Sequence, residues 1–241
     1  MTDRELLVAL RGIRKDYHGL RPLRVERFEF RAGDTVALLG FDRAAAEVLV
    51  NLMTGATLPD AGDVQVFGAS TGQIADAHAW FQLLDRIGVL SDRVVLLEEL
   101  TVEQNLALPW SFDVERMPGE VRAQVERLGA EVGLVGGTLR ARMTEAGPDI
   151  RTRVRLGKAL ALEPRMLLAE HPTAALASPD VPRFAADLSS IAAQRGLAML
   201  VLTADAAFAS AACRQLLSWR PATGALETAS GWWSRLTGRA R

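Results

Sequence analysis

Cysteine, lysine and any excess of one charge are scarce in this chain of 241 residues. The one cysteine, Cys213, cannot form a disulfide within the chain, which favours a reducing compartment. Lysine provides only two of the 28 basic residues, at Lys15 and Lys158. Lys and Arg together nearly cancel 29 acidic residues, and the pI is about 6.3. No strongly basic face is expected, which argues against a nucleic-acid partner bound through counterion release.

We also expect no membrane-spanning segment and no secretory signal from this sequence. The richest apolar stretch, residues 197–213, contains Asp205 and is too short to span a bilayer. Asp3 and Glu5 stand where a secretory signal would be positive, so we expect no export signal. With 49% hydrophobic and 24% charged residues, the composition is that of a water-soluble globular protein. A cytoplasmic location is therefore expected.

Apolar periodicity predicts strands followed by one helix in the first part of the chain. Short apolar or alternating runs at residues 6–10, 23–30, 35–39 and 62–68 predict strands. The run 35–39 is continuously apolar, as in a strand buried on both faces of a sheet. Residues 44–53 have a helical period that stops before Gly55.

The second part of the chain, from residue 102, contains charged segments of helical period and apolar runs that predict strands. Residues 102–158 are charged, helical in period and interrupted by prolines, which predicts a helical insertion. Residues 165–170 and 197–203 predict strands, each followed by a helical stretch. A closing hairpin is expected from residues 215–219 and 224–228. This alternation predicts an α/β protein with a parallel sheet and sites at the carboxyl ends of its strands.

Four ungapped segments occur in the order found in the nucleotide-binding subunit of ATP-binding-cassette (ABC) transporters. They are LLGFDRAAAEVLVNLMTG, IGVLSDRVVLLEELTVEQNLALP, RTRVRLGKALALEPRMLLAEHPTAAL and AMLVLTADAAFA. They resemble, in turn, the phosphate loop, the Gln-loop region, the signature helix through the Walker B strand, and the switch strand. The phrase LTVEQNLALP is most similar to the lipoprotein-release, macrolide-efflux and lipid-transport branches.

This resemblance implies a fold and a division of the chain. The expected fold is a P-loop-NTPase-like cassette with a mainly parallel core sheet, an N-terminal antiparallel β subdomain and a helical insertion. We expect a single domain over residues 1–241, with an α/β core at 1–101 and 159–241 and a helical subdomain at 102–158.

The residues that carry chemistry in this family are replaced here. A phosphate loop GxxxxGK[ST] needs glycines to curl its amides around phosphate, a Lys for the phosphate oxygens and a hydroxyl for Mg²⁺. Gly40 is kept, but Arg43 and Ala45 occupy glycine positions, Ala46 the Lys position and Glu47 the hydroxyl position.

The other motifs differ in the same way. The Gln-loop glutamine corresponds to Asp92, and the signature LSGGQ corresponds to residues 146–150, AGPDI. The Walker B aspartate corresponds to Glu170, the catalytic glutamate to His171 and the switch histidine to Ala204. We expect a vestigial nucleotide site at these positions, together with Tyr17, which matches the residue that stacks on adenine.

The replacements make the site about three to four charges more negative than the family pattern. Like charges about 4 Å apart repel by roughly 4 kcal/mol at an effective dielectric constant near 20. Loss of the Lys–phosphate bond removes about 1.5–3 kcal/mol more. We therefore expect no ordinary binding of MgATP, with ATP and Mg²⁺ as cofactors left as the alternative.

Residues 41–52 also form a helical pattern without reference to any family. Asp42 is suited to the N-cap, alanines form the first turns, and Glu47 lies near the positive end of the helix dipole. We predict that residues 42–47 are helical or tightly turned and that Asp42 or Glu47 supplies the negative charge that phosphate would otherwise bring.

Two interpretations are open for the acidic residues of the site. Glu170 and His171 are either a rearranged metal ligand and general base, or a strand-end carboxylate and a turn imidazole. Glu47, Asp92 and Glu170 either hold a divalent cation or are solvated and paired with arginine, with Arg43 as the internal counter-ion.

Two aromatic features also have alternative interpretations. Tyr17 either stacks on a base or covers the edge of the sheet. The tail residues Trp232 and Trp233, with nearby arginines, either touch a membrane interface or pack on the domain.

Three hypotheses for function follow. The leading one is a catalytically silent cassette at the inner face of the membrane that pairs with a permease and with itself or an active cassette. Its permease contacts would come from residues 91–108 and the helical insertion. The second is an active or slow ATPase with unusual motifs. The third is a stand-alone module that binds a cation or another small ligand.

Overall fold

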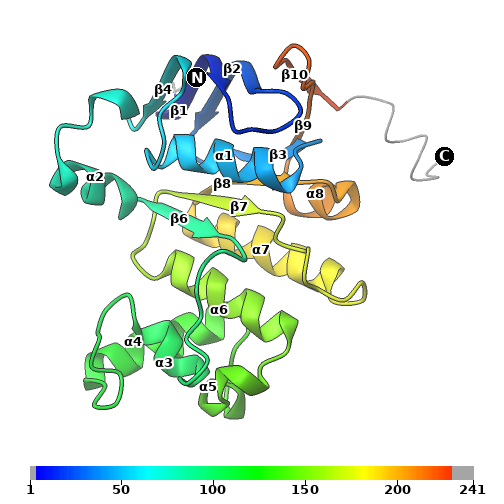
Figure 1. The fold of residues 1–241 in the computed structure, drawn as a ribbon. Helices are drawn as coiled ribbons and strands as arrows, with labels where there is room; N and C mark the ends of the chain where they lie inside the picture. The colour runs from blue at the N-terminus through cyan, green and yellow to red at the C-terminus, as the bar shows by residue number, and fades with distance from the viewer. Residues whose placement is uncertain (1–3, 230–241) are drawn as a thin grey trace.

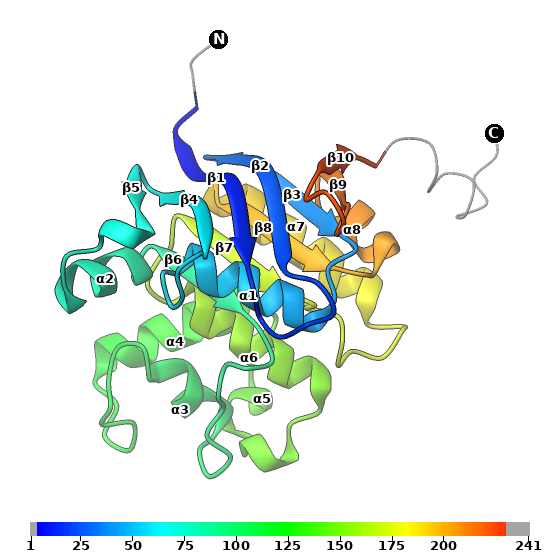
Figure 2. The same ribbon diagram turned by 45° about the horizontal axis from the view of Figure 1, so that its top comes forward.

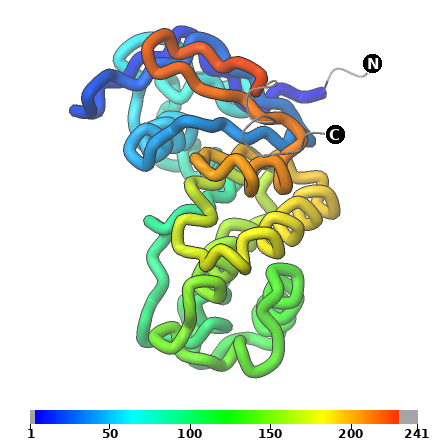
Figure 3. Tube along the Cα trace, turned by 90° about the vertical axis from the view of Figure 1, so that its right-hand side faces the viewer, coloured from blue at the N-terminus to red at the C-terminus, as the bar shows by residue number. Residues whose placement is uncertain are grey.

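The computed structural model describes residues 4–229, and the tail with Trp232 and Trp233 lies outside this part. An antiparallel sheet, a central helix, a mainly parallel sheet and a set of helices follow one another as layers (Figure 1). Most of the last layer comes from the middle of the chain, residues 102–160, and extends away from the two sheets (Figure 3).

The antiparallel sheet has the order β2-β1-β4-β5 within the described residues. Its strands are β1 Leu6–Lys15, β2 Leu23–Arg31, β4 Ala61–Val66 and β5 Ala69–Ser70. In β1 and β2 the register places Val8 opposite Phe30 and Leu10 opposite Phe28, so that apolar residues share the inner face. This sheet is the N-terminal antiparallel part expected from the resemblance, and it lies over β3 and α1 (Figure 2).

The second sheet has six described strands in the order β10-β9-β3-β8-β7-β6. The strands are β3 Thr35–Leu39, β6 Ile87–Leu90, β7 Met166–Glu170, β8 Ala198–Thr203, β9 Gln215–Trp219 and β10 Leu226–Thr228. All neighbours pair in parallel except β9 and β10, which form the predicted hairpin. The predicted parallel core sheet is therefore confirmed.

Both faces of this sheet are buried, which explains its continuously apolar strands. Along β3, Val36 and Leu38 face the core under the antiparallel sheet, whereas Ala37 and Leu39 face the core under the helices. Helix α1, Arg43–Met53, lies between the two sheets. Its buried residues, including Leu49, belong to the core that the antiparallel sheet covers.

Helices cover the other face and form the insertion. The remaining helices are α2 Ala77–Leu84, α3 Val102–Ala107, α4 Gly119–Glu131, α5 Gly137–Arg140, α6 Pro148–Leu160, α7 Val181–Arg195 and α8 Ala206–Ala212. Two short 3₁₀ turns, Thr71–Gln73 and Met143–Glu145, complete the described part. Buried residues of α3, α4, α6, α7 and α8 share one core with β3, β7 and β8.

The predicted elements differ from the structure in a few places. Strand β1 continues to Lys15, past the predicted end at residue 10, whereas α1 begins at Arg43, directly after the predicted N-cap Asp42. Helix α2 is not predicted, because its eight residues are fewer than the window over which an apolar period is recognised.

Candidate functional site

The candidate site lies at the edge of the parallel sheet where β3, β7 and β6 end, with β8 between β3 and β7. Gly40 follows β3, Ser91 follows β6, and Glu170 is the last residue of β7. This edge is where α/β proteins bind ligands, because loops from successive strands meet there.

The N-terminus of α1 is closed by the chain itself. The Asp42 carboxylate accepts a hydrogen bond from the Ala45 amide at 2.8 Å, and the Ala46 amide donates to the Asp42 carbonyl oxygen at 2.9 Å. The predicted N-cap and the helical conformation from Arg43 onward are therefore confirmed. Two amides that a phosphate loop would present to its ligand are bonded within the helix end instead.

Apolar packing fixes the loop before this helix. Gly40 has a φ of +94°, which favours glycine, and Phe41 is buried against Trp219 with ring centroids 4.2 Å apart. The side chains of Ala45 and Ala46 are fully buried. The position matched to the phosphate-loop lysine thus contributes a buried methyl group.

Asp92 and Arg43 form an ion pair at the surface side of the site. Arg43 extends from the first turn of α1 and Asp92 from the loop after β6, and both side chains are largely exposed. The expected role of Arg43 as an internal counter-ion is borne out for Asp92.

A second arginine, Arg93, holds the other two carboxylates. Its Nε donates to Glu170 Oε2 at 3.0 Å and its Nη2 donates to Glu170 Oε1, while Nη1 lies 3.5 Å from Glu47 Oε1. Nη1 also donates to Asn51 Oδ1 at 3.4 Å. The hydrogen bonds to Glu170 are the largest cause that raises the pKa of Arg93 above its usual value.

Glu170 is buried, and both of its carboxylate oxygens have partners. Besides Arg93, the Ser91 hydroxyl donates to Oε2 at 2.8 Å, and Ser91 Oγ in turn accepts the Arg93 amide at 3.2 Å. A buried carboxylate is tolerated when a charged partner and hydrogen bonds compensate it, as here. Sequence analysis missed Arg93 and Ser91, and their place directly beside Asp92 was the one available indication.

The three predicted acidic residues thus form arginine pairs. Within residues 4–229 no group of three or more His, Cys, Asp or Glu side chains is arranged to hold a metal ion. The structure brings Glu47 and Glu170 to the same guanidinium and places Asp92 with Arg43.

His171 borders a cavity of about 140 Å³ that is also lined by Ser91, Asp92, Arg155 and Glu170. The residue has a φ of +41°, and its amide donates to the Leu202 carbonyl at 2.8 Å. Its buried Nε2 has no hydrogen-bond partner in the described structure. His171 and Glu170 therefore line the same cavity, but no polar group of residues 4–229 is bonded to that nitrogen.

Ala204 and the residues matched to the signature take no polar part in this cavity. Ala204 is exposed, and its neighbour Asp205 caps α8 by accepting the Phe208 amide at 2.9 Å. Asp149 accepts a hydrogen bond from Arg153 at 3.0 Å in the first turns of α6. Arg153 also pairs with Asp187 at 2.8 Å, so Asp149 belongs to a network that joins α6 to α7.

Tyr17 packs against the apolar core between the sheets and lies near the N-terminus of α1. Burial and the nearby charge of Asp42 raise the pKa of its hydroxyl. A side chain at Gly19 would meet the Tyr17 ring at 2.7 Å, so the loop is folded closely over the ring. This packing is that of an aromatic residue covering the sheet, one of the two predicted alternatives.

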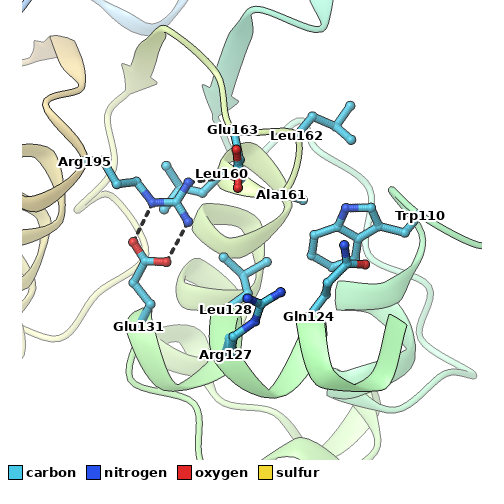
Figure 4. Close-up of a pocket in the computed structure, with 10 residues that line it drawn as sticks. All are labelled: Trp110, Gln124, Arg127, Leu128, Glu131, Leu160, Ala161, Leu162, Glu163 and Arg195. Atoms are coloured by element: carbon cyan, nitrogen blue, oxygen red, sulfur yellow. Dashed lines mark hydrogen bonds and ion pairs between the residues drawn. The ribbon is translucent and has the colours of Figure 1, made fainter. Parts of the chain in front are cut away.

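A larger cavity of about 450 Å³ lies away from these residues, between α4, the end of α6 and α7. Figure 4 shows its wall, where Arg195 donates twice to Glu131 at 2.5 and 2.6 Å. None of the predicted site residues lines it.

Solved structures with the same architecture are ATP-binding cassettes. The cassette MJ0796, in a dimeric post-hydrolysis state bound to ADP and Pi, gives a TM-score of 0.75 at 22% identity over 94% of this chain and all of that one. The cbiO1 protein of Clostridium perfringens, part of the transporter complex cbiONQ, gives 0.77 at 16% identity over 98% and 92% of the two chains. At this identity the likeness shows the fold, which is the expected P-loop-NTPase-like cassette.

Residues 23–174 match the model of the ABC transporter family, and the chain belongs to that family. The ribose import ATP-binding protein RbsA 2 of Streptomyces coelicolor is 31% identical over 73% of this chain and 34% of its own length. The macrolide export ATP-binding/permease protein MacB of Rhodopirellula baltica is 28% identical over 86% and 31%. The chain spans about a third of the length of these curated relatives. No helix within residues 4–229 is long and apolar enough to cross a membrane.

Proposed function

We propose that this chain is a non-hydrolysing cassette subunit of a membrane transporter, with a structural or regulatory role at the inner face of the membrane. The observation that carries the proposal is the Arg93 guanidinium between Glu47 and Glu170. These two residues match the hydroxyl and the carboxylate that hold Mg²⁺ in P-loop proteins. A fixed cation of the chain therefore pairs with both residues that match the Mg²⁺ ligands.

The residues present do not fit MgATP. The ammonium that reaches the phosphates is replaced by the buried Ala46, and the amides of Ala45 and Ala46 are bonded to Asp42. A triphosphate would also have to draw Arg93 from Glu170. Leaving a buried charge without its partner costs about 3–5 kcal/mol, and the lower end applies because Arg93 is 34% exposed.

An apolar groove supports contact with a permease. It has a volume of about 310 Å³ and lies between α2, β6, the loop after β6 and the end of α6. Its apolar lining residues are Leu84, Ile87, Val89, Val94, Pro109, Ala159, Leu162 and Pro164. Phe81 and Val95 are 58% and 69% exposed, one on α2 and the other in the loop after β6. Exposed apolar surface of this kind marks protein contacts, and we propose that a cytoplasmic segment of the permease binds here.

Calorimetric titration with MgATP tests the silent site. We expect no heat of binding at micromolar to millimolar ATP and no release of phosphate, whereas an active cassette assayed alongside gives both. Micromolar affinity with turnover would overturn the proposal and favour the ATPase hypothesis.

The partner cassette is part of the same proposal. The similar solved cassette MJ0796 is dimeric, which supports assembly of this chain with itself or with an active cassette. The hypothesis of a stand-alone cation-binding module receives less support, because arginines already contact Glu47, Asp92 and Glu170.

A further inference from the structure

The loop of residues 91–101, here called the connector, joins β6 to α3 and runs from the candidate site to the helical insertion. On the site side, Arg93 reaches Glu170 at the end of β7 and Glu47 and Asn51 on α1. The Arg93 amide donates to Ser91 Oγ at 3.2 Å and the Val94 amide donates to the Ser91 carbonyl at 3.2 Å. The first four residues of the connector are thus fixed to two other elements of the core.

Two cations of α6 hold the middle of the connector. Arg155 Nε donates to the Val94 carbonyl at 3.1 Å, and Lys158 Nζ donates to the Val95 carbonyl at 3.0 Å. Both cations have a lowered pKa, for which burial is the first cause. Hydrogen bonds from partly desolvated cations are stronger than those at an open surface.

The far half of the connector is held separately by Asn105 in α3. Its Oδ1 accepts the Leu97 amide at 2.8 Å, and its Nδ2 donates to the Leu97 carbonyl at 2.9 Å. Asn105 is fully buried, so this attachment does not depend on the charges of the site. The attachment of the first half of the connector through Arg93 and that of the far half through Asn105 can therefore be tested independently.

Val94, the residue after Arg93, lines the apolar groove. A bound metal ion or nucleotide is exchangeable, whereas a guanidinium attached to the connector stays with it. We propose that Arg93 is a built-in substitute for an exchangeable cation, which clamps the connector to α1 and β7 and keeps the Val94 wall of the groove in one arrangement. The link from this clamp to permease binding rests on the proposed function, but the clamp itself does not.

The planar fork of arginine suits this role better than lysine would. Nε and Nη2 engage both oxygens of Glu170, and Nη1 is left for Glu47 and Asn51 on another element. Lysine presents a single ammonium on a flexible stem and cannot hold two elements in a fixed plane. Arg93 is therefore a positioning residue for the connector.

Amide hydrogen exchange of the full chain, resolved by residue, tests the clamp. In Arg93→Gln we expect the amides of residue 93 and Val94, which are bonded to Ser91, to exchange about tenfold faster, because the charge-assisted side-chain bonds to Glu170 that fix this part of the connector are lost. The Leu97 amide, bonded to Asn105, should change by less than about twofold. Arg93→Lys should fall between the wild type and Arg93→Gln at Val94.

Arg195→Gln is the matched control, because Arg195 also makes a two-bond pair with a single carboxylate, Glu131, away from the connector. It should lower the thermal midpoint without changing exchange at residues 93 and 94. If the amides of residues 93 and 94 exchange at the wild-type rate in Arg93→Gln, Arg93 does not fix the connector and the proposal is wrong. If MgATP slows exchange of the Val94 amide in the wild type, the site binds nucleotide and the proposed function is wrong. This result differs from the one that contradicts the clamp, so the two proposals are tested separately.

Discussion

Single residues in this protein show how burial acts differently on a paired and an unpaired ionisable group. Glu170 is buried, and Arg93 and Ser91 provide hydrogen-bond partners for both of its oxygens. Cys213 is also buried, and desolvation raises its pKa to about 12. The partner, and not burial alone, decides whether the group can carry charge.

Cys213 should consequently be unreactive in the folded protein. At pH 8 we expect alkylation by iodoacetamide to be about a thousandfold slower than in the unfolded chain, because the thiolate is the nucleophile. Mass spectrometry gives this rate directly, since the chain has one cysteine. Labelling at the unfolded rate would show that the thiol is accessible and ionised.

The same pKa shift predicts how this thiol affects stability with pH. A thiol whose pKa is higher in the folded state stabilises the fold below its unfolded pKa, and this contribution is lost as the pH rises toward 12. Cys213→Ala should remove that dependence at alkaline pH.

At the scale of elements, α1 shows how a local sequence change alters a ligand-binding loop. Alanines extend the helix to Arg43, and the Asp42 carboxylate takes the amide that a phosphate would otherwise receive. The cap thus satisfies the Ala45 amide within the chain, which stabilises the start of the helix.

Substitution of Asp42 tests this cap. Asp42→Ala should lower the free energy of unfolding by about 1 kcal/mol, while Asp42→Asn should retain most of the stability because asparagine is an equally good N-cap. Denaturant midpoints measure both changes. Equal losses in the two variants would indicate that the charge of Asp42, and not its cap hydrogen bond, stabilises the helix.

Absorbance titration of the single tyrosine gives a second measurement on the same variants. The pKa of Tyr17 should fall toward its usual value in both, because the negative charge of Asp42 is one of its two causes. It should stay above that value, since burial is the larger cause.

For the whole molecule, the sheet edge, the connector and the apolar groove form one continuous path. Glu170 ends a core strand, Arg93 joins it to the connector, and Val94 opens onto the groove. α6 contributes to the same path through Arg155 and Lys158, which bind the connector carbonyls. Charges at the site and the shape of the proposed docking surface are therefore linked through a few residues.

Permease binding can be tested at the edge of this groove. Val95→Glu should reduce co-purification with the permease at least tenfold, because a carboxylate would have to be desolvated in an apolar contact. The thermal midpoint should not change, since Val95 is 69% exposed. Leu58→Glu is the control, because Leu58 is also exposed, at 47%, but lies between α1 and β4, away from the groove and from the helical insertion. Equal co-purification of both variants would place the contact elsewhere.

Much of the fold could be predicted because its signals are local. The continuous apolar runs of β3, β7 and β8 reflect burial on both faces, and the period of α1 with Asp42 before it reflects one helix and its cap. The site was predicted as a set of altered positions, with Arg43 as counter-ion. Helix α2 was not predicted, because eight residues are too short for an apolar period to stand out from the sequence.

The sequence by itself determined the cassette layout, the apolar Ala46 in the first turn of α1 and the capped start of that helix, because each depends on residues close together in the chain. The tertiary structure alone decided which cation meets which carboxylate. Arg93 and Glu170 are 77 positions apart, and Phe41 stacks on Trp219 from a different strand end. Such pairings depend on how β3, β6, β7 and β9 are ordered in the sheet, and no periodicity along the chain encodes that order.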